Sequence, residues 1–345
     1  MCYFDYTLYR HFKKIAFYLK VFIPALVIGY LLFYAFAPQS YTDKKPELIT
    51  ILKGESLKET AYKLYDEKLV SNPYMFYCIG FISGYSRYIQ AGTYYVSANQ
   101  SPASIYYKFV NGRVAESSVT IPPGLNMFQI AAILYKNKIT GKRLFLIKCF
   151  DEKFLLSLKI DAKSAEGFLY PDTYIFKINS SPADIIKEMV NEFYIKTKNM
   201  KINYDDLIIA SIIIKEAGGR HKNSMALISS VIHNRLKINM PLDIDSTSIY
   251  SQNLMFCKKY IINFGKFKQN SDMESSYLKI KSPYNTYLNY GLPPTPIANP
   301  DIKAITAALN PAKTRYLYYI STKYGKTLFA YNLAGQIKNI DKYLK

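Results

Sequence analysis

The chain has 345 residues, and its composition already excludes several classes of protein. Hydrophobic residues make up 50% and charged residues 20%, which is typical of folded domains and not of a disordered chain. The formal net charge of +20 favours an anionic partner or surface. Only seven of the 45 cationic residues are arginine, and no recognition motif accompanies them, so nucleic acid is not expected as a partner.

An apolar run near the N-terminus predicts a membrane-spanning helix over residues 15–37. Its last part, residues 21–37, carries no charge, and the whole segment is long enough to cross a hydrocarbon layer of ~30 Å. Ala35-Phe36-Ala37 also resembles a signal-peptide cleavage site. The apolar run is longer than a signal peptide's core, however, and Pro38 would follow the cut, so a retained anchor is favoured.

Cationic residues before this helix predict its orientation. Arg10, Lys13 and Lys14 should stay on the cytoplasmic side, which makes residues 1–14 a cytoplasmic tail. The expected protein is therefore single-pass, with most of the chain outside the cytoplasm.

An internal repeat follows a polar linker expected over residues 38–46. At an offset of 70 residues, Ile49–Gly54 aligns with Val119–Gly124, and the apolar positions after each segment also align. Each copy predicts a short strand, a glycine turn and an amphipathic helix. We expect a small module over residues 47–116 and a second strand–helix repeat, or connector, over residues 117–160.

The rest of the first module predicts a strand–helix–helix–strand order. Arg87–Val96 has the pattern of a strand with a glycine kink, and Ser101-Pro102-Ala103 opens another helix toward Gly112. This order is compatible with an ordinary α+β spacer and with a LysM-like carbohydrate-binding module. The residues alone do not distinguish the spacer from the carbohydrate-binding module.

The most unusual local pattern predicts a buried helix that begins after Asn203. Asn203 is a favourable N-cap, and Gly218 or Gly219 should end the helix. The intervening residues are apolar on nearly every face, which indicates burial.

Glu216 lies in the last turn of this helix, above the apolar stripe of Ile209, Ile212 and Ile213. Desolvation and the negative end of the helix dipole should both raise its pKa, as a general acid requires. An ordinary helix-end glutamate that reaches solvent remains the alternative from the residues alone.

A longer string of residues resembles a known family. Residues 166–174, with the sequence EGFLYPDTY, are similar to the signature of the YceG-like endolytic murein transglycosylases. The family's other blocks resemble, in the same order, residues 210–216, 234–236, 240–247, 284–287, 291–300 and 308–312. The resemblance thus extends through the whole chain, anchor included.

The resemblance implies a membrane-anchored lyase of the bacterial inner (plasma) membrane that cuts within nascent peptidoglycan glycan strands, with its bulk periplasmic or extracytoplasmic. The implied fold class is α+β, with an N-terminal transmembrane helix, a small LysM-like α/β module and a larger α+β catalytic domain over residues 161–345. No metal or cofactor is expected. Glycan strands and the lipid bilayer are the expected partners, and cell-wall synthases are a further partner to consider.

Glu216 occupies the position of the family's catalytic glutamate. As the single acid and then base, it would cleave the bond between N-acetylmuramic acid (MurNAc) and N-acetylglucosamine (GlcNAc) and leave a 1,6-anhydro end. The polar residues that should bind the sugars lie in neighbouring blocks. They are Tyr170, Asp172, Tyr174, Asn234, Arg235, Asp245, Thr247, Tyr284, Asn285 and Tyr287.

The chain departs from the family at several positions. Ile214 replaces a second helix glutamate, Ser246 replaces proline and Thr295 replaces glycine. The family's two C-terminal histidines are Thr327 and Gln336 here, which leaves reduced activity open.

Two other functions remain open from the sequence. A non-catalytic, membrane-tethered protein could bind peptidoglycan and recruit synthases, and it would bind glycan without forming product. A true hydrolase would need Asp172, Asp243 or Asp245 as a second carboxyl group.

Overall fold

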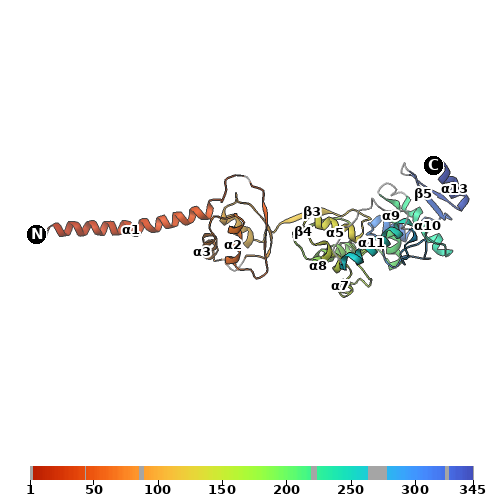
Figure 1. Cartoon of the computed structure of the whole chain (residues 1–345), viewed down its shortest axis with the longest axis horizontal. Coiled ribbons are helices and arrows are strands. Elements are labelled where there is room, and N and C mark those ends of the chain that lie inside the picture. The colour runs from red at the N-terminus through yellow and green to blue at the C-terminus, as the bar shows by residue number, and fades with distance from the viewer. Residues whose placement is uncertain are drawn as a thin grey trace. The chain divides into compact units, whose positions relative to one another are not determined.

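The computed structural model describes residues 3–42, 44–84, 89–218, 224–262, 278–322 and 326–344. The chain is a mixture of helices and short strands (Figure 1) and folds as two compact units, Met1–Glu116 and Ser117–Lys345. Each unit has its own cluster of buried apolar side chains. The α+β class expected from the sequence is confirmed.

The N-terminal helix α1 spans Tyr3–Phe36, so it begins earlier than predicted and includes most of the expected cytoplasmic tail. Its apolar part, Tyr9–Phe36, has 28 residues and a mean hydropathy of 2.1. At 1.5 Å per residue this part is ~42 Å long, which exceeds the hydrocarbon layer of a bilayer. Helix α1 is therefore long and apolar enough to cross a membrane once.

After α1, the first unit contains a two-stranded antiparallel sheet, β1–β2, accompanied by helices. The elements are β1 (Glu47–Ile51), α2 (Leu57–Asp66), α3 (Pro73–Ile82), β2 (Gly92–Val96) and α4 (Pro102–Val110). The predicted strand–helix–helix–strand order is present, although Arg87, at the start of the expected second strand, lies outside the described residues. Ser101 caps α4 as expected.

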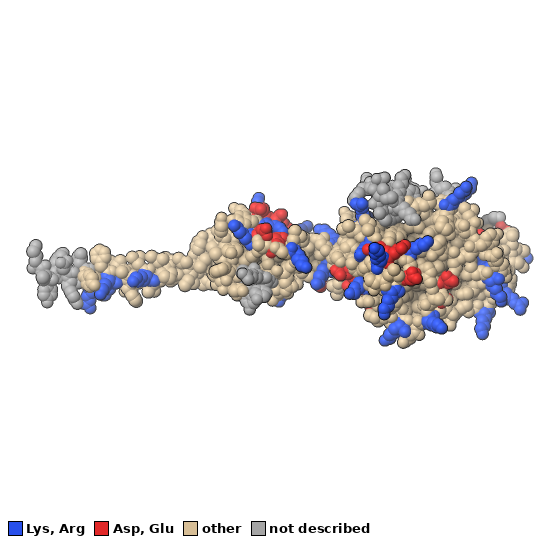
Figure 2. Space-filling model, turned by 90° about the horizontal axis from the view of Figure 1, so that it is seen from below, with Lys and Arg blue, Asp and Glu red and all other residues tan. Residues whose placement is uncertain are grey.

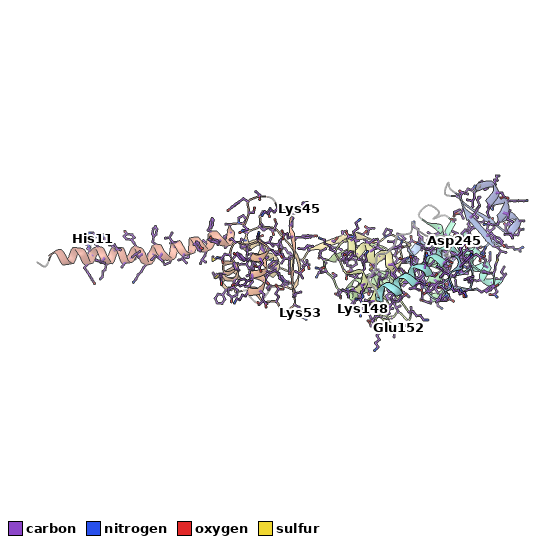
Figure 3. The ribbon with its side chains drawn as sticks, viewed as in Figure 1. His11, Lys45, Lys53, Lys148, Glu152 and Asp245 are labelled. Carbon is purple, nitrogen blue, oxygen red and sulfur yellow. The ribbon has the colours of Figure 1, made fainter. Side chains whose placement is uncertain are left out.

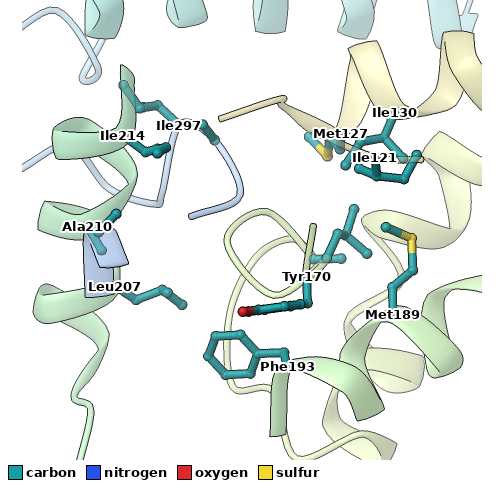
Figure 4. Packing of buried hydrophobic residues seen from close by; sticks show 14 of the residues in the cluster. Ile121, Met127, Ile130, Tyr170, Met189, Phe193, Leu207, Ala210, Ile214 and Ile297 are labelled. Atoms are coloured by element: carbon teal, nitrogen blue, oxygen red, sulfur yellow. The ribbon is translucent and has the colours of Figure 1, made fainter. Parts of the chain in front are cut away.

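The second unit contains the sheets β3–β4 and β5–β6, the latter antiparallel. Its elements are β3 (Glu116–Thr120), α5 (Met127–Lys136), α6 (Lys142–Cys149), α7 (Glu152–Ser157), β4 (Thr173–Lys177), α8 (Pro182–Thr197), α9 (Tyr204–Ala217), α10 (Met225–Lys237), α11 (Asp245–Ile262), α12 (Ile302–Leu309), β5 (Tyr318–Ser321), β6 (Thr327–Ala330) and α13 (Leu333–Tyr343). Helix α9 is the centre of this unit and packs on α10, α11 and α12. Figure 4 shows Leu207, Ala210 and Ile214 along α9, with Ile297 beside Ile214.

The internal repeat predicted from the sequence is present in the structure. Helices α2 and α5 begin at corresponding positions, and both start with a capping box, at Ser56 and Asn126. Lys68 and Lys138, at the ends of the two copies, have φ values of 55° and 57°. The same local conformation therefore recurs at the same offset.

The repeat also continues past the positions aligned in the sequence and beyond residue 160, the expected end of the second copy or connector. Thr50 and Thr93 pair across β1 and β2 through hydroxyl oxygens 3.0 Å apart, and Thr120 and Thr173 pair across β3 and β4 at 2.8 Å. The order strand, helix, helix, strand and helix therefore recurs from β3 to α8, with α7 inserted. The boundary expected after residue 160 falls inside this second copy.

Each copy contains a buried tyrosine whose hydroxyl donates to a backbone carbonyl four residues earlier. The Tyr94 hydroxyl donates to the Gln90 carbonyl at 2.7 Å, and the Tyr174 hydroxyl donates to the Tyr170 carbonyl at 2.6 Å. Helices α4 and α8 then begin with the same Ser-Pro-Ala sequence. Tyr170 and Tyr174, two of the expected sugar-binding residues, belong to this repeat.

Candidate active site

Helix α9 has the ends that the sequence predicts. Asn203 is the N-cap, and its side-chain oxygen accepts a hydrogen bond from the Asp206 amide at 2.8 Å. Gly218 follows the last turn with a φ of 52°, a conformation that favours glycine. Gly219, the other candidate for this end, lies outside the described residues.

The Glu216 carboxyl group is held by two hydroxyl groups. The Ser246 hydroxyl in the first turn of α11 donates to Oε1 at 2.8 Å, and the Tyr319 hydroxyl from β5 donates to Oε2 at 2.9 Å. The glutamate is half-buried, so it is neither sealed in the core nor free in solvent. Three elements that are distant in the sequence therefore fix the orientation of one carboxyl group.

Burial dominates the electrostatics of this group. Desolvation raises the pKa of Glu216, and the two hydroxyl donors oppose this because they stabilise the carboxylate. The nearby Asp245 charge raises the pKa further, while Lys215 has the smallest influence and lowers it. The direction of the pKa shift expected from the sequence is confirmed, and a raised pKa favours the protonated form that a general acid requires.

Two residues that differ from the family pattern expected from the sequence contact Glu216 or its partner Tyr319. Ser246 is in the first turn of a helix, where proline is tolerated because its backbone N–H needs no intrahelical acceptor. Serine fits the same backbone and adds a hydroxyl donor to Glu216. The Gln336 side chain donates to the Tyr319 carbonyl at 3.0 Å, and the Thr327 hydroxyl lies 3.3 Å from that of Ser224.

Two expected sugar-binding residues lie next to this network. Asp245 is exposed at the start of α11, where Figure 3 labels it, and it directly precedes Ser246. The Tyr287 hydroxyl donates to Asp245 Oδ1 at 2.6 Å, and 37% of Tyr287 is exposed. These two side chains remain candidates for contact with a ligand beside Glu216.

Three other expected binding residues are internal supports. Thr247 and Asn285 are both 0% exposed, so their side chains lie inside the folded unit. The Asn285 amide instead donates to two backbone carbonyls, and the Thr247 hydroxyl donates to the Ile244 carbonyl at 2.7 Å. Tyr284 is also buried, with its hydroxyl 2.9 Å from that of Thr295. Polar loop residues also satisfy buried backbone groups, and that is the role these contacts show, while sugar contact at the three residues stays a prediction.

Asn234 and Arg235 support the strand that carries Tyr319. The Asn234 amide donates to the carbonyls of Thr314 and Tyr316, at 3.0 and 2.9 Å. Arg235 is buried and donates through Nε to the Leu317 carbonyl at 2.6 Å. Both side chains therefore position β5, although the sequence equally allowed contact with sugar.

The expected residues of the second repeat have internal partners too. Tyr170 and Tyr174 are buried, and Asp172 pairs with Lys196 at 3.3 Å. Asp243, another possible second carboxyl, contacts Arg235 Nη1 at 3.3 Å. Of the three aspartates considered for a hydrolase, Asp245 is the one whose charge raises the pKa of Glu216.

Sequence reasoning missed a buried network between the second repeat and the loop before α12. Glu166 is fully buried, and desolvation raises its pKa to about 8. Its carboxyl accepts hydrogen bonds from the Met127 amide at 3.0 Å, the Asn299 amide at 2.7 Å and the Tyr250 hydroxyl at 3.1 Å. Both Glu166 and Asn299 lie within blocks recognised in the sequence, but nothing local indicated that they meet.

Comparisons with known proteins identify the family of this chain. Residues 49–342 match the YceG-like family, so the chain belongs to that family. A relative from Bacillus subtilis, named endolytic murein transglycosylase, is 31% identical over 92% of this chain and 91% of its own length. A relative of the same name from Streptococcus pneumoniae is 28% identical over 97% of this chain and 66% of its own length.

A solved structure shares the fold. The crystal structure of a YceG-like protein from Listeria monocytogenes is 30% identical and covers 86% of this chain and 99% of its own, with a TM-score of 0.55. Family membership and these relatives place the chain among the lytic transglycosylases, which are lyases.

Proposed function

We propose that this chain is a membrane-anchored endolytic transglycosylase that cleaves the MurNAc–GlcNAc bond within peptidoglycan strands and forms 1,6-anhydro-MurNAc ends. The observation that carries the proposal is the Glu216 carboxyl group, whose pKa burial raises and whose two oxygens are both held by hydroxyl groups. The names of the relatives support the same substrate.

In the proposed reaction, one carboxyl group acts twice. Protonated Glu216 donates its proton to the oxygen between MurNAc C1 and GlcNAc C4, the C1–O bond breaks, and GlcNAc leaves with a free hydroxyl. The resulting carboxylate removes the proton from the C6 hydroxyl of the same MurNAc, and that oxygen bonds to C1. Glu216 is protonated again, no water is consumed, and no second catalytic carboxyl is required.

The anchor and the first module determine where this reaction takes place. Helix α1 holds the enzyme in the bacterial inner (plasma) membrane by a single pass, with the chain that follows α1 on the outer side. Lys and Arg side chains are spread over the visible surface (Figure 2), which suits an anionic cell wall. Residues 47–116 serve as a LysM-like glycan-binding module, and residues 161–345 carry the chemistry.

The proposal is tested by the mass of the products. The full chain in detergent micelles is incubated with purified, uncrosslinked glycan strands, and the released ends are analysed by mass spectrometry. We expect anhydro ends that arise from within the strands. Reducing ends, each heavier by one water, would contradict the transglycosylase mechanism.

One observation favours a second candidate function, hydrolysis. Asp245 is exposed next to Ser246, and its charge acts on Glu216. A carboxylate at this place could activate water in place of the substrate's own hydroxyl. In that case Asp245→Asn would remove the reducing-end product in the same assay.

A non-catalytic scaffold that binds glycan and recruits synthases would give a third outcome. The full chain would sediment with glycan strands and release no ends of either kind. Product formation that depends on Glu216 excludes this function.

Removal of the Ser246 hydroxyl tests whether its hydrogen bond lowers the pKa of Glu216. Because its hydrogen bond lowers the pKa of Glu216, Ser246→Ala should raise that pKa further. The alkaline limb of the profile of kcat/KM against pH should therefore move to higher pH. Ser157→Ala, which removes an exposed hydroxyl bonded only to the Phe154 carbonyl, is the matched control and should leave the limb in place. A shift to lower pH in Ser246→Ala would contradict the assignment.

A further inference from the structure

A surface groove beside the β5–β6 hairpin carries side chains that the proposed mechanism does not use. Its volume is about 480 Å³, which is in the range of small-ligand pockets. Among the described residues, its lining consists of Lys313, Thr314, Arg315, Tyr316 and Tyr331, of which two are cationic and none is acidic. The groove therefore favours an anionic ligand.

Two tyrosines form an aromatic wall of the groove. The rings of Tyr316 and Tyr331 are stacked, with centroids 4.6 Å apart and planes 26° apart. Tyr316 also packs on Phe329 at 5.4 Å, which fixes it from the core side. Tyr331 is 60% exposed, so its ring offers a flat apolar surface to a ligand.

The backbone of the groove is preformed. The Asn234 amide donates to the carbonyls of Thr314 and Tyr316, and the Ser230 and Thr314 hydroxyl groups lie 2.7 Å apart. A backbone fixed in this way loses little conformational entropy when a ligand binds. The cationic side chains of Lys313 and Arg315 remain exposed at the surface.

The groove lies on the segment that leads into the active site. Tyr316 is three residues before Tyr319, whose hydroxyl donates to Glu216. The Tyr316 and Tyr319 rings also both pack on Phe329, with centroid distances of 5.4 and 6.2 Å. A group attached to the MurNAc that reacts at Glu216 is therefore within reach of the groove.

We infer that this groove binds the peptide stem of the reacting glycan through the stem's carboxylates, an inference that rests on the proposed function. MurNAc carries its short peptide on the lactyl group, and the peptide's free carboxylates are the anionic groups of such a strand. Arg315 can bind a carboxylate through two parallel hydrogen bonds, and Lys313 adds a second positive charge. The tyrosine surface packs against the aliphatic part of the stem.

The test compares ligands that differ only in the stem. The full chain with Glu216→Gln, in detergent micelles, is titrated by calorimetry with GlcNAc–MurNAc-peptide, with the same disaccharide without peptide, and with the peptide form whose carboxylates are amidated. We expect the carboxylate form to bind roughly five- to tenfold more tightly than the other two, the range that two exposed ion pairs can supply. Adding Lys313→Gln and Arg315→Gln should remove this preference.

The matched control removes two exposed lysines elsewhere in the unit, Lys303→Gln and Lys338→Gln, and should keep the preference. Equal affinity for all three ligands, survival of the preference without Lys313 and Arg315, or an equal loss in the control would each overturn the inference. Failure of the proposed function is distinguishable from these outcomes, because it would appear as missing anhydro products from the unmodified chain, whatever the binding data show.

Discussion

Glu216→Gln is expected to lower the rate of glycan cleavage by roughly 10²- to 10⁴-fold, the range for loss of a general acid. Glutamine has nearly the same shape, but its amide nitrogen cannot accept a hydrogen bond from Ser246 or Tyr319 as a carboxyl oxygen does. The loss of one such contact costs about 1 kcal/mol of folding free energy, so the variant should still fold. The measurement is the release of anhydro ends, together with near-UV circular dichroism of the folded chain.

The control for this substitution is Glu152→Gln, which neutralises an exposed glutamate in the first turn of α7. It should keep the wild-type rate. If Glu216→Gln also kept that rate, another residue would be the acid, and the proposed mechanism would be wrong.

Asn299→Ala is expected to destabilise the second unit by about 3–5 kcal/mol, because several buried polar groups lose their partners at once. The Asn299 oxygen accepts hydrogen bonds from the amides of Gly167 and Leu169, at 2.8 and 2.9 Å. Its nitrogen donates to the Leu125 carbonyl at 3.0 Å and to Glu166 at 2.7 Å. One side chain therefore joins the second repeat to the loop before α12.

The measurement is denaturant unfolding of the full chain in detergent, followed by near-UV circular dichroism of tyrosine, since the chain has 34 tyrosines and no tryptophan. Asn310→Ala is the control, because its side chain is exposed and, among the described residues, its amide donates to the Thr306 carbonyl one turn away. It should change the free energy of unfolding by about 0.5 kcal/mol or less. Equal stability of the two variants would refute the role of Asn299.

The sequence predicted those parts of the molecule that local patterns determine. The apolar run predicted α1, and Asn203 and Gly218 predicted both ends of α9. The apolar residues Ile209, Ile212 and Ile213 predicted that the pKa of Glu216 is raised. Helix periodicity alone places them on the same side of the helix as its carboxyl group.

Features that depend on tertiary packing were missed. Nothing near Tyr319 indicates that it contacts Glu216, since the two residues are 103 positions apart. Buried supports such as Thr247 and Asn285 have the same polar side chains as sugar-binding residues, so composition could not separate the two roles. The sequence showed only the first part of the second copy of the repeat. Helix α7 has no counterpart in the first copy, so the residues after it no longer align at the same offset.

The long sequence separation between Glu216 and Tyr319 also has a consequence for biosynthesis. A chain that is synthesised from its N-terminus presents α9 well before the β5–β6 hairpin emerges. During that interval the acid has no phenol partner, and the strand that orients it is missing. A chain interrupted between these residues keeps α1 and α9 but lacks the strand that carries Tyr319, so Glu216 would have lost one of its two hydroxyl partners.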